Sequence, residues 1–536
     1  MYDVVESNIE ELYPDIKDTI KNASFIAFDA EFSGIQSDEQ MKYSLFDSLD
    51  DRYKILRKNI KSYVIVQCGI VAFKHVPDKN IYKAKSYNFY LLPRSVPFKN
   101  RQFLWQVSAL EFLSTHNFDF NKFVNEGITY LDEIDEDLMT KHVKEGNLQR
   151  NLEYLSYEEE DDFKDCKNKV SEWISTYPNE ISMVLKAASP ILQYMMHKEL
   201  RSSFKNIWTV YGHKSITVIR VSDDMRLVLE NEQTDNLEEK LLNCCIGFSK
   251  VFKLLTSTRK PIIGHNVLLD LMFMHQQFYK PLPCSYREFK STIHSLFPQI
   301  YDTKFLASQV KQVLDKEVNW KISSLSAIHQ YFTSKQRKYS AFNSPQIMTE
   351  NKSSDENAYH TAGWDAYYAG YIFVKMAHIL CIKQYGEGLE YRAVTHSELM
   401  SSVKCFVNSI NITRGNEVYS KLDGDDPLST RPEWLHVKLN SPCINIKEVA
   451  KVFSSFGPID VMPFARKRVL VAVGNHRSAL DILTYFKNSK EFQVARYSPI
   501  RHAPPRKLIL WGGVVLSGGM LAWMIQRVFK KSVISN

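Results

Sequence analysis

Two carboxylates close an apolar stretch near the N-terminus of the chain. Residues 25–34 read FIAFDAEFSG, in which four apolar residues precede Asp29 and Glu31. Side chains alternate along a strand, so residues two apart lie on the same face. Neighbouring buried carboxylates repel each other unless a cation neutralises them, and Mg²⁺ or Mn²⁺ prefers such oxygen ligands. Taken alone, an Asp-x-Glu pair is more typical of a solvated strand end than of a metal site.

Two distant segments shift that balance toward a metal site. The stretch PIIGHNVLLDLMF (residues 261–273) predicts a short strand, a turn and a helix that carries Asp270. The stretch HTAGWDAYYAG places His360 five residues before Asp365, at the start of another helical pattern. Residues about one turn apart share a helix face, so a histidine in the preceding loop or first turn can lean over this carboxylate. The three segments together predict a hydrolytic centre.

In chain order, these five residues resemble the D-x-E, D, H-x-A-x-x-D pattern of the DEDD exonucleases. The chain further resembles the PARN-like 3′-to-5′ exoribonucleases of the DEDDh type. Within them it resembles the branch that carries a C-terminal membrane tail and trims pre-piRNAs. The segments that carry this resemblance are FDAEFSGI, SALEFLSTHNFDFNKFVNEGITYL, GHNVLLDLMFMHQQF and IYDTKFLAS, which spread over most of the first 380 residues.

The resemblance implies a reaction and a role for each residue of the site. Two Mg²⁺ ions, with Mn²⁺ as the alternative, would be held by Asp29, Glu31, Asp270 and Asp365. His360 would take the proton from the attacking water, with a pKa raised by the neighbouring carboxylates. The enzyme would release 5′-nucleotides from the 3′ end of a single-stranded RNA.

Length, charge and cysteine usage bound the class of protein. A chain of 536 residues is long enough for three or four domains. The net charge of +7 is mild, so a nucleic-acid surface would have to be a local patch. The eight cysteines include no C-x-x-C pair, which favours a reducing compartment. The acidic N-terminus resembles neither a secretory signal nor a transit peptide.

We therefore expect an α/β protein with the ribonuclease-H-like fold of the DEDD exonucleases. Its nuclease domain would comprise residues 1–155 and 246–385. Strands at residues 64–73 and 87–92 would lie antiparallel beside the first strand. Acidic clusters at residues 132–137 and 158–162 are predicted to be solvated linker or helix surface.

A small α+β domain at residues 160–245 is predicted to interrupt the nuclease. Helices are expected over 170–177 and 181–204, followed by a strand. The PARN-like family has a nucleic-acid-binding module at this place, with an Arg and a His four residues apart. Here His197 and Arg201 occur in the reverse order, so an ordinary basic helix surface is an equal alternative.

A third module, at residues 430–500, resembles an RNA-recognition motif. Its signals run strand, helix, turn, strand and helix. Bases stack on aromatic residues of the central strand in such motifs. Arg468 and Leu470 stand at those positions here. This favours a degenerate module used for packing or protein contact over an RNA reader.

An apolar tail closes the chain. Residues 508–525, LILWGGVVLSGGMLAWMI, form an uncharged run of 18 residues between basic flanks. As a helix it would span about 27 Å, close to the roughly 30 Å of a bilayer core. We expect a transmembrane anchor rather than a buried core helix. A short anchor with basic flanks suits the mitochondrial outer membrane, with the catalytic part facing the cytosol.

The resemblance predicts trimming of pre-piRNA 3′ ends in RNA-mediated silencing. It implies a Tudor-domain piRNA adaptor and PIWI-bound precursor RNA as partners, and it allows a homodimer. Two alternatives stay open. One is a membrane-anchored poly(A)-specific ribonuclease, or deadenylase. The other is a catalytically inactive RNA-binding scaffold, against which the five filled catalytic positions argue.

Overall fold

The computed structural model describes residues 1–36, 43–77, 79–146, 148, 155–231, 236–314, 324–334, 343–350, 359–386, 392–440 and 445–502. The chain divides into two compact units, and each is described by itself. The first unit comprises Met1–Met41, Tyr53–Asn411 and Tyr419–Asp426. The second comprises Lys42–Arg52, Ile412–Val418 and Pro427–Asn536.

A seven-stranded sheet forms the centre of the first unit. Its strands follow the order β1-β4-β3-β2-β8-β9, and β10 pairs with β4. β2 runs antiparallel to β3, and β3 antiparallel to β4, which confirms the predicted antiparallel neighbours. β8 and β9 add parallel strands on the other side of β2. The strands are β1 (Tyr2–Val4), β2 (Phe25–Phe32), β3 (Ile65–Val76), β4 (Ile81–Tyr90), β8 (Ile262–Gly264), β9 (Ile300–Asp302) and β10 (Gln346–Thr349).

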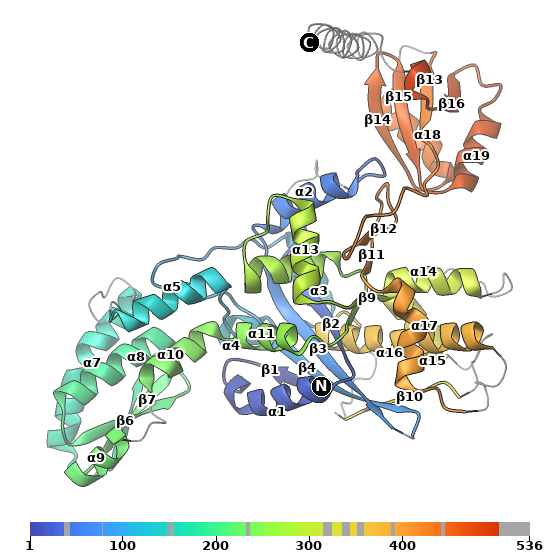
Figure 1. The fold of residues 1–536 in the computed structure, drawn as a ribbon. Helices are drawn as coiled ribbons and strands as arrows, with labels where there is room; N and C mark the ends of the chain where they lie inside the picture. The colour runs from blue at the N-terminus through green and yellow to red at the C-terminus, as the bar shows by residue number, and fades with distance from the viewer. Residues whose placement is uncertain are drawn as a thin grey trace, which may run out of the picture. The chain divides into compact units, whose positions relative to one another are not determined.

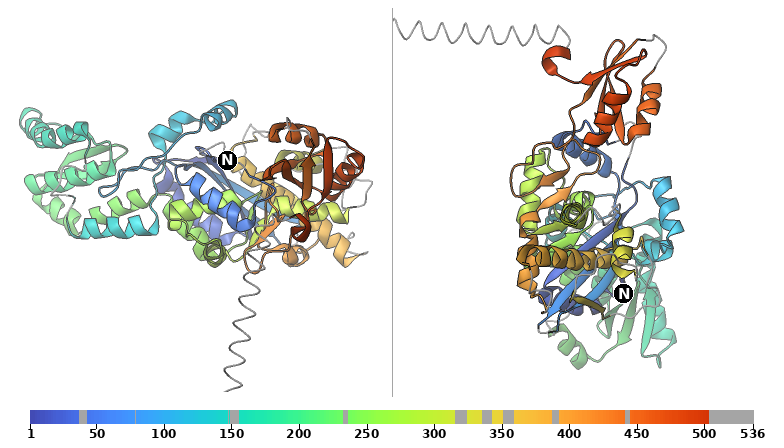
Figure 2. Two further views of the ribbon diagram at one scale, coloured as in Figure 1. Left: turned by 90° about the horizontal axis from the view of Figure 1, so that it is seen from above. Right: turned by 90° about the vertical axis from the view of Figure 1, so that its right-hand side faces the viewer.

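Helices cover both faces of this sheet (Figures 1 and 2). α16 (Ala362–Tyr385) packs on the face that carries Phe25 and Ala27 of β2. The residues of α16 are buried on every side of the helix, as expected for a helix enclosed in a core. α1 (Ile9–Asn22) packs on the opposite face, where Asp15 accepts a hydrogen bond from Tyr87 of β4 (2.7 Å). This α/β architecture is the one that the sequence predicts.

The other elements of the chain up to residue 426, apart from those in 157–246, are mostly short helices. They are α2 (Leu49–Ile60), α3 (Val107–Thr115), α4 (Phe120–Glu126), α5 (Glu133–Lys144), α11 (Ser249–Thr258), α12 (Leu268–Met274), the π-helix η3 (His275–Tyr279), α13 (Tyr286–Leu296), α14 (Thr303–Val313), α15 (Leu325–Thr333), α17 (His396–Val403), the 3₁₀-helix η5 (Lys404–Phe406), and strands β11 (Ser409–Asn411) and β12 (Tyr419–Lys421).

Residues 157–246 form a three-stranded antiparallel sheet with four helices. The strand order is β5-β7-β6. The helix predicted from residue 181 is wrong in its first part, because β5 precedes α8 there. Ser189 caps α8 and Pro190 opens it, and proline disfavours helix in the residues before it. The elements are α7 (Tyr157–Thr176), β5 (Ser182–Lys186), α8 (Pro190–Ser203), β6 (Ile207–Gly212), β7 (Ser215–Arg220), α9 (Asp223–Asn231) and α10 (Leu237–Ile246).

His197 and Arg201 tie α8 to β6 instead of forming a free basic surface. His197 is fully buried, and its Nδ1 lies 2.6 Å from the Thr209 hydroxyl. Arg201 donates to the hydroxyl and to the carbonyl of Thr209 (2.8 and 2.6 Å) and lies over the Trp208 ring. The interpretation of this pair as a basic helix surface is therefore wrong for His197. Both side chains hold α8 against β6.

The two acidic clusters differ in their surroundings. Glu158 and Asp161 are exposed in the first turns of α7, as predicted. Asp135, in contrast, is buried and pairs with Lys99 and Arg101, each at 2.7 Å. The prediction of a solvated surface is therefore wrong for that residue, which two cations neutralise in place of water, and for Asp132, which is also buried.

The second unit contains a four-stranded antiparallel sheet with the order β14-β15-β13-β16. The sequence did not reveal β14 or β16. β14 contains Pro463 and is mostly half-exposed, and β16 is mostly exposed, so neither shows a strong apolar pattern. The elements are β13 (Leu435–Leu439), α18 (Ile446–Phe453), the 3₁₀-helix η6 (Ser454–Phe456), β14 (Ile459–Ala465), β15 (Arg468–Val473), α19 (His476–Tyr485), β16 (Phe492–Arg496) and α20 (Pro499–His502).

The face of this sheet that points away from its helices is partly covered. Val437 and Val471 point into the core with α18 and α19, so their neighbours along the strands, His436 and Leu470, point the other way. His436 and Leu470 are nevertheless buried, and the His436 ring stacks on His502 at 4.2 Å. Side chains of the same unit therefore occupy the area where an RNA reader would stack bases.

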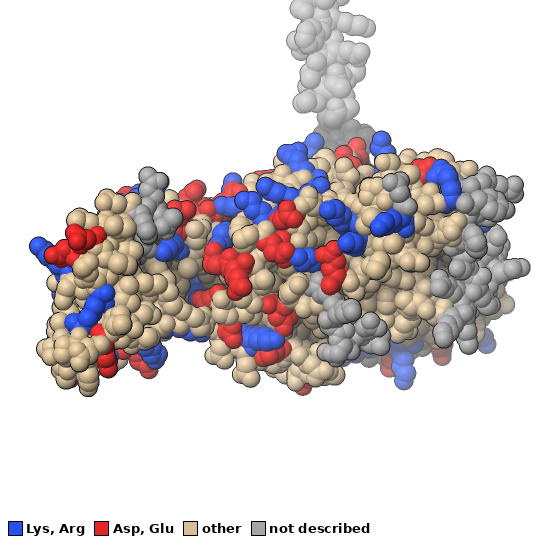
Figure 3. All heavy atoms as spheres, turned by 90° about the horizontal axis from the view of Figure 1, so that it is seen from below, with Lys and Arg blue, Asp and Glu red and all other residues tan. Residues whose placement is uncertain are grey.

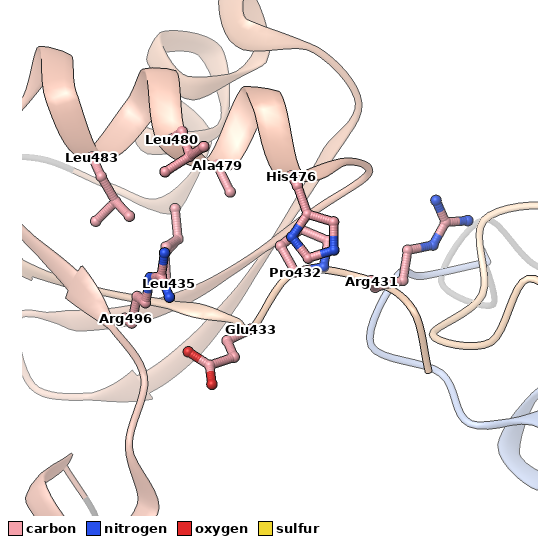
Figure 4. Close-up of a pocket in the computed structure, with 9 residues that line it drawn as sticks. All are labelled: Arg431, Pro432, Glu433, Leu435, His476, Ala479, Leu480, Leu483 and Arg496. Atoms are coloured by element: carbon pink, nitrogen blue, oxygen red, sulfur yellow. The ribbon is translucent and has the colours of Figure 1, made fainter. Parts of the chain in front are cut away.

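A hollow of about 250 Å³ lies on the helix-covered side of this unit. Figure 4 shows Leu480 and Leu483 of α19 above Leu435 and Arg496. His476, at the start of α19, contacts the Thr430 carbonyl through Nε2 (3.0 Å). The hollow is thus lined by helix and strand-end residues and not by the face that carries Leu470.

The distribution of charged side chains on the surface agrees with the mild net charge of +7. Basic and acidic side chains are intermixed over the described surface seen in Figure 3.

Among the residues that the structure describes, no helix combines the length and apolar character needed to cross a bilayer. The transmembrane helix predicted at 508–525 lies outside the described residues and stays a prediction.

Candidate active site

Asp29 and Glu31 lie on the face of β2 that α16 covers. Both share this face with Phe25 and Ala27, whose side chains pack against α16. Asp365, in the first turn of α16, completes a cluster in which carboxylate oxygens of the three residues lie within 4.8 Å of one another. Segments more than 330 residues apart in the sequence are thereby brought to one place.

The start of α16 is held against the sheet by polar side chains. The Gln67 side chain accepts a hydrogen bond from the N–H of Ala362 (3.0 Å), and the Asn88 side chain accepts one from Gly363 (3.2 Å). Gly69, which pairs with Asp29 across the strands, lets the helix approach, since a Cβ there would lie 1.9 Å from the Ala362 carbonyl oxygen. These contacts set Asp365 beside Asp29.

Asp270 is buried on α12 and joins the same group of charges. The strand before it, β8, pairs with β2 in parallel, which brings the start of α12 to the end of β2 that carries Asp29. Its carboxylate is not part of the trio within 4.8 Å, yet its charge raises the pKa of both Asp29 and Glu31. All four predicted carboxylates therefore interact.

The turn before α12 is fixed by a buried carboxylate. Asp302 is 1% exposed and accepts hydrogen bonds from the N–H groups of Asn266 (2.9 Å), Val267 (3.3 Å), Lys304 (2.9 Å) and Asn411 (3.0 Å). Asn266 has φ +64, a left-handed conformation that asparagine tolerates. Asp302 thus determines where α12 begins, and with it the position of Asp270.

His360 stands at the edge of the cluster, in the turn before α16. Its backbone has φ +67, and its N–H donates to the Asp365 carboxylate (3.2 Å). Its ring is exposed and packs edge-to-face on Phe112 and His116 of the α3 segment, at 5.0 and 4.2 Å between centroids. The ring faces α3, while the backbone touches the carboxylates.

The comparisons with known proteins identify the family. Residues 4–373 match the CAF1 family ribonuclease. The chain belongs to the CAF1 ribonucleases. It is 33% identical to the pre-piRNA 3′-exonuclease trimmer of Bombyx mori over 98% of this chain and 99% of that protein. It is also similar to the poly(A)-specific ribonuclease PNLDC1 of Mus musculus, at 29% identity over 98% and 99%, and to human PARN, at 27% over 92% and 80%.

The carboxylates of this CAF1 ribonuclease hold protons unusually tightly. Burial, followed by the charges of their neighbours, raises the pKa of Asp29 and Glu31 well above the ordinary range. Burial raises the pKa of Asp270 and of Asp365 to about 7. So many acidic groups cannot ionise together at neutral pH without a positive charge among them. An all-oxygen donor set of this kind fits a hard divalent cation.

The prediction that carboxylates raise the pKa of His360 is wrong for the protein without metal. Burial, followed by the nearby charge of His116, lowers the pKa of His360. Within the described residues, the imidazole has no ion pair with a carboxylate, because the ring packs toward α3. His360 is consequently neutral, and able to accept a proton, at pH 7.

Three supporting residues of this CAF1 site were not singled out from the sequence. Gln67 and Gly69 interrupt the apolar run VIVQCGIVAF, and Asn88 interrupts the next strand. A polar residue or a glycine inside a buried strand is the signal that could have marked them. Asp302 lies in the segment IYDTKFLAS, and its sequence context indicates no role for it. Its partners come from three separate segments, so spacing alone could not show them.

The raised carboxylate pKa values predict how divalent ions stabilise the protein at different pH. Unfolded carboxylates lose their protons near pH 4, whereas Asp270 and Asp365 keep theirs to about pH 7. The metal-free protein therefore loses unfolding free energy as pH rises between these values. A bound cation restores it. At about 100 times its Kd, a cation contributes about 2.7 kcal/mol, or roughly 3 °C in Tm for a unit of about 400 residues.

Thermal unfolding with Mg²⁺ and with EDTA, at pH 5.5 and pH 8, measures this effect. We expect the Mg²⁺-induced rise in Tm to be larger at pH 8, since protons compete for the carboxylates at pH 5.5. Asp29→Asn should abolish most of it. An equal rise at both pH values, or one that survives in Asp29→Asn, would contradict a metal site at these residues.

Proposed function

We propose that this CAF1 ribonuclease is a 3′-to-5′ exoribonuclease of the DEDDh type that depends on two divalent metal ions, Mg²⁺ in the first instance. The observation that carries the proposal is the cluster of Asp29, Glu31 and Asp365, extended by the charge of Asp270 and bordered by His360. Five residues that the reaction needs, from three distant segments, meet at one end of β2. This argues against an inactive scaffold.

The chemistry follows from the groups present. Asp29, Glu31, Asp270 and Asp365 would hold the ions, which when bound activate water and stabilise the leaving 3′ oxygen. His360 is neutral at pH 7 and exposed, so its imidazole can receive the proton of the attacking water. Attack on the terminal phosphodiester would release a 5′-nucleotide. Exposure of the ring leaves access for a single-stranded 3′ end.

Pre-piRNA is the substrate that we propose. The support is the relative from Bombyx mori, a pre-piRNA 3′-exonuclease aligned over nearly the full length of both chains. Poly(A) is the second candidate, because the mouse and human relatives are named poly(A)-specific ribonucleases. Digestion of 3′-labelled RNAs separates the two. Pre-piRNA trimming predicts similar rates on poly(A) and mixed sequence and a block at a 2′-O-methyl end, whereas a deadenylase should prefer poly(A).

The accessory parts complete the proposal. Residues 160–245 would be a domain inserted into the nuclease, and residues 430–500 a degenerate RNA-recognition-motif-like domain. The second assignment is supported by the burial of Leu470 and His436, which leaves these strand positions unable to stack bases. By resemblance to the trimming exonucleases, a Tudor-domain adaptor with PIWI-bound RNA would recruit the enzyme, and residues 508–525 would anchor it in the mitochondrial outer membrane.

Truncation before Lys507 tests the role of the tail. Every residue of the proposed site precedes the cut, so turnover on a short free RNA should stay within about twofold of the full-length enzyme. Membrane association should be lost, and trimming in cells should fall, since anchoring raises the local concentration of enzyme beside a membrane-bound adaptor. Carbonate extraction and sequencing of RNA 3′ ends measure the two effects.

Anchor replacement serves as the control. An unrelated mitochondrial outer-membrane helix in place of residues 508–525 should restore trimming, and an endoplasmic-reticulum helix should not. A truncated protein that stays in the carbonate-resistant fraction would disprove the anchor. Equal trimming with the endoplasmic-reticulum helix would disprove the mitochondrial assignment.

A further inference from the structure

The segment SALEFLSTHNFDF marks the family but has no role in the chemistry described so far. It contains α3, and its start is tied to the chain just after β2. The Gln106 N–H donates to the Ser33 carbonyl (2.8 Å), and the Gln106 side chain accepts from the Ile35 N–H (3.3 Å). A helix anchored beside the end of β2 therefore carries His116, the residue that follows its last turn, to the edge of the carboxylate cluster.

His116 is itself held in one orientation. Its Nδ1 lies 2.8 Å from the Phe112 carbonyl oxygen one turn earlier. A carbonyl can only accept, so Nδ1 carries the proton and the ring cannot turn freely. The His116 ring also packs on Phe112, at 4.5 Å between centroids. A fixed aromatic surface results, half-buried and facing the turn before α16.

The His360 ring, by contrast, has few contacts that fix its orientation. Its backbone adopts a left-handed conformation, its ring is exposed, and the structure records no side-chain hydrogen bond for the ring among the described residues. The ring contacts recorded for it are those to Phe112 and His116, the closer being the His116 ring at 4.2 Å and 73°. A general base must be held toward the proton that it accepts.

We infer that His116 is a positioning residue, which holds the His360 imidazole in the orientation needed for catalysis through edge-to-face packing of the two rings. This inference rests on the proposed role of His360 as the general base. The role belongs to the ring of His116 and not to its charge, since the contact is one of ring packing. Aromatic pairs of this geometry contribute enough to bias an orientation by roughly 3- to 10-fold.

A double-mutant cycle tests this inference with four full-length proteins: wild type, His116→Ala, His360→Ala and the double variant. The expected result is a roughly 3- to 10-fold lower kcat for His116→Ala with KM unchanged. On the His360→Ala background, the same substitution should have no further effect, because the residue it positions is gone. Mn²⁺ affinity and Tm should not change.

Two further variants sharpen the cycle. His116→Phe keeps the ring and should recover most of the lost kcat. Ser114→Ala, on an exposed position of the same turn, should match wild type. Additive losses, a change confined to KM, or no recovery in His116→Phe would overturn the inference. If His360→Ala itself retained full activity, the proposed base would be wrong. A large effect of His360→Ala with none of His116→Ala would reject this inference alone.

Discussion

Asp29→Asn should reduce cleavage of a 3′-labelled RNA in Mg²⁺ to less than about 1% of the wild-type rate. The substitution keeps the shape of the side chain but removes a negative oxygen from the centre of the cluster, where it contacts Glu31 and Asp365 within 4.8 Å. Without it, the site would hold the proposed cations, which when bound would activate water and stabilise the leaving oxygen, less well. Initial rates from gel-resolved time courses provide the measurement.

The same loss is expected for the other three carboxylates. Glu31→Gln, Asp270→Asn and Asp365→Asn each remove a ligand, while the fold should persist. Metal-free stability at pH 8 should hold or rise, because each change relieves repulsion among buried anions. Asp161→Asn, at an exposed position of α7, is the matched control and should leave the rate unchanged. Near wild-type rates in two of the four variants would place the site elsewhere.

His360→Ala is expected to lower kcat by roughly 10²–10⁴-fold, the usual contribution of a positioned base. RNA binding and Mn²⁺ binding should be retained, because the His360 contact to the cluster is made by its backbone N–H. The deficit should shrink as pH rises and hydroxide becomes available. Single-turnover rates between pH 5.5 and 9 measure it.

The lowered pKa of His360 also predicts how the activity of the wild-type enzyme changes toward low pH. The base works only when deprotonated, and burial together with His116 lowers the pKa of His360 below its usual 6.5. Activity should therefore persist to a lower pH than an unperturbed histidine would allow, before the carboxylates lose their cations. A variant that no longer bound Mn²⁺ would show His360 to be a ligand or a structural residue, not the base.

The central strand and the catalytic residues could be predicted from the sequence because their signals are local. An apolar run ending in Asp29 and Glu31 specifies both a buried strand and the common face of the two carboxylates. Asp270 and Asp365 each occur within a strand–turn–helix or loop–helix pattern of fewer than fifteen residues. The structure brings these segments together as the predicted order requires.

The residues that support the site could not be predicted, because their partners are far apart in the sequence. The Gln67 and Asn88 side chains accept hydrogen bonds from N–H groups at the start of α16, nearly 300 residues later in the sequence. Asp302 accepts hydrogen bonds from three separate segments. The surroundings of His360 were misjudged for the same reason. Its distance in sequence from Asp365 is short, but its ring is turned toward His116, which is 244 residues away.

The three-stranded and the four-stranded sheet show a different limit. At residues 182–186 a short strand precedes α8, although the predicted helix ran unbroken through Pro190, which disfavours helix in the residue before it. β14 and β16 show only short apolar alternations, Ile459 with Val461 and Phe492 with Val494, in strands that are otherwise largely half-exposed or exposed. His197 and Arg201 appeared basic and available, but tertiary hydrogen bonds to Thr209 hold both of them.

The central claim is that Asp29, Glu31, Asp270 and Asp365 hold divalent ions for stepwise hydrolysis from an RNA 3′ end. Its most direct test is a time course on a 5′-labelled RNA with Mg²⁺, with the released products identified by mass spectrometry. The account predicts a ladder that shortens by single nucleotides from the 3′ end, release of 5′-nucleotides, and loss of both with EDTA or in Asp29→Asn. Internal cuts, products with 3′ phosphates, or an unchanged ladder in Asp29→Asn would contradict it.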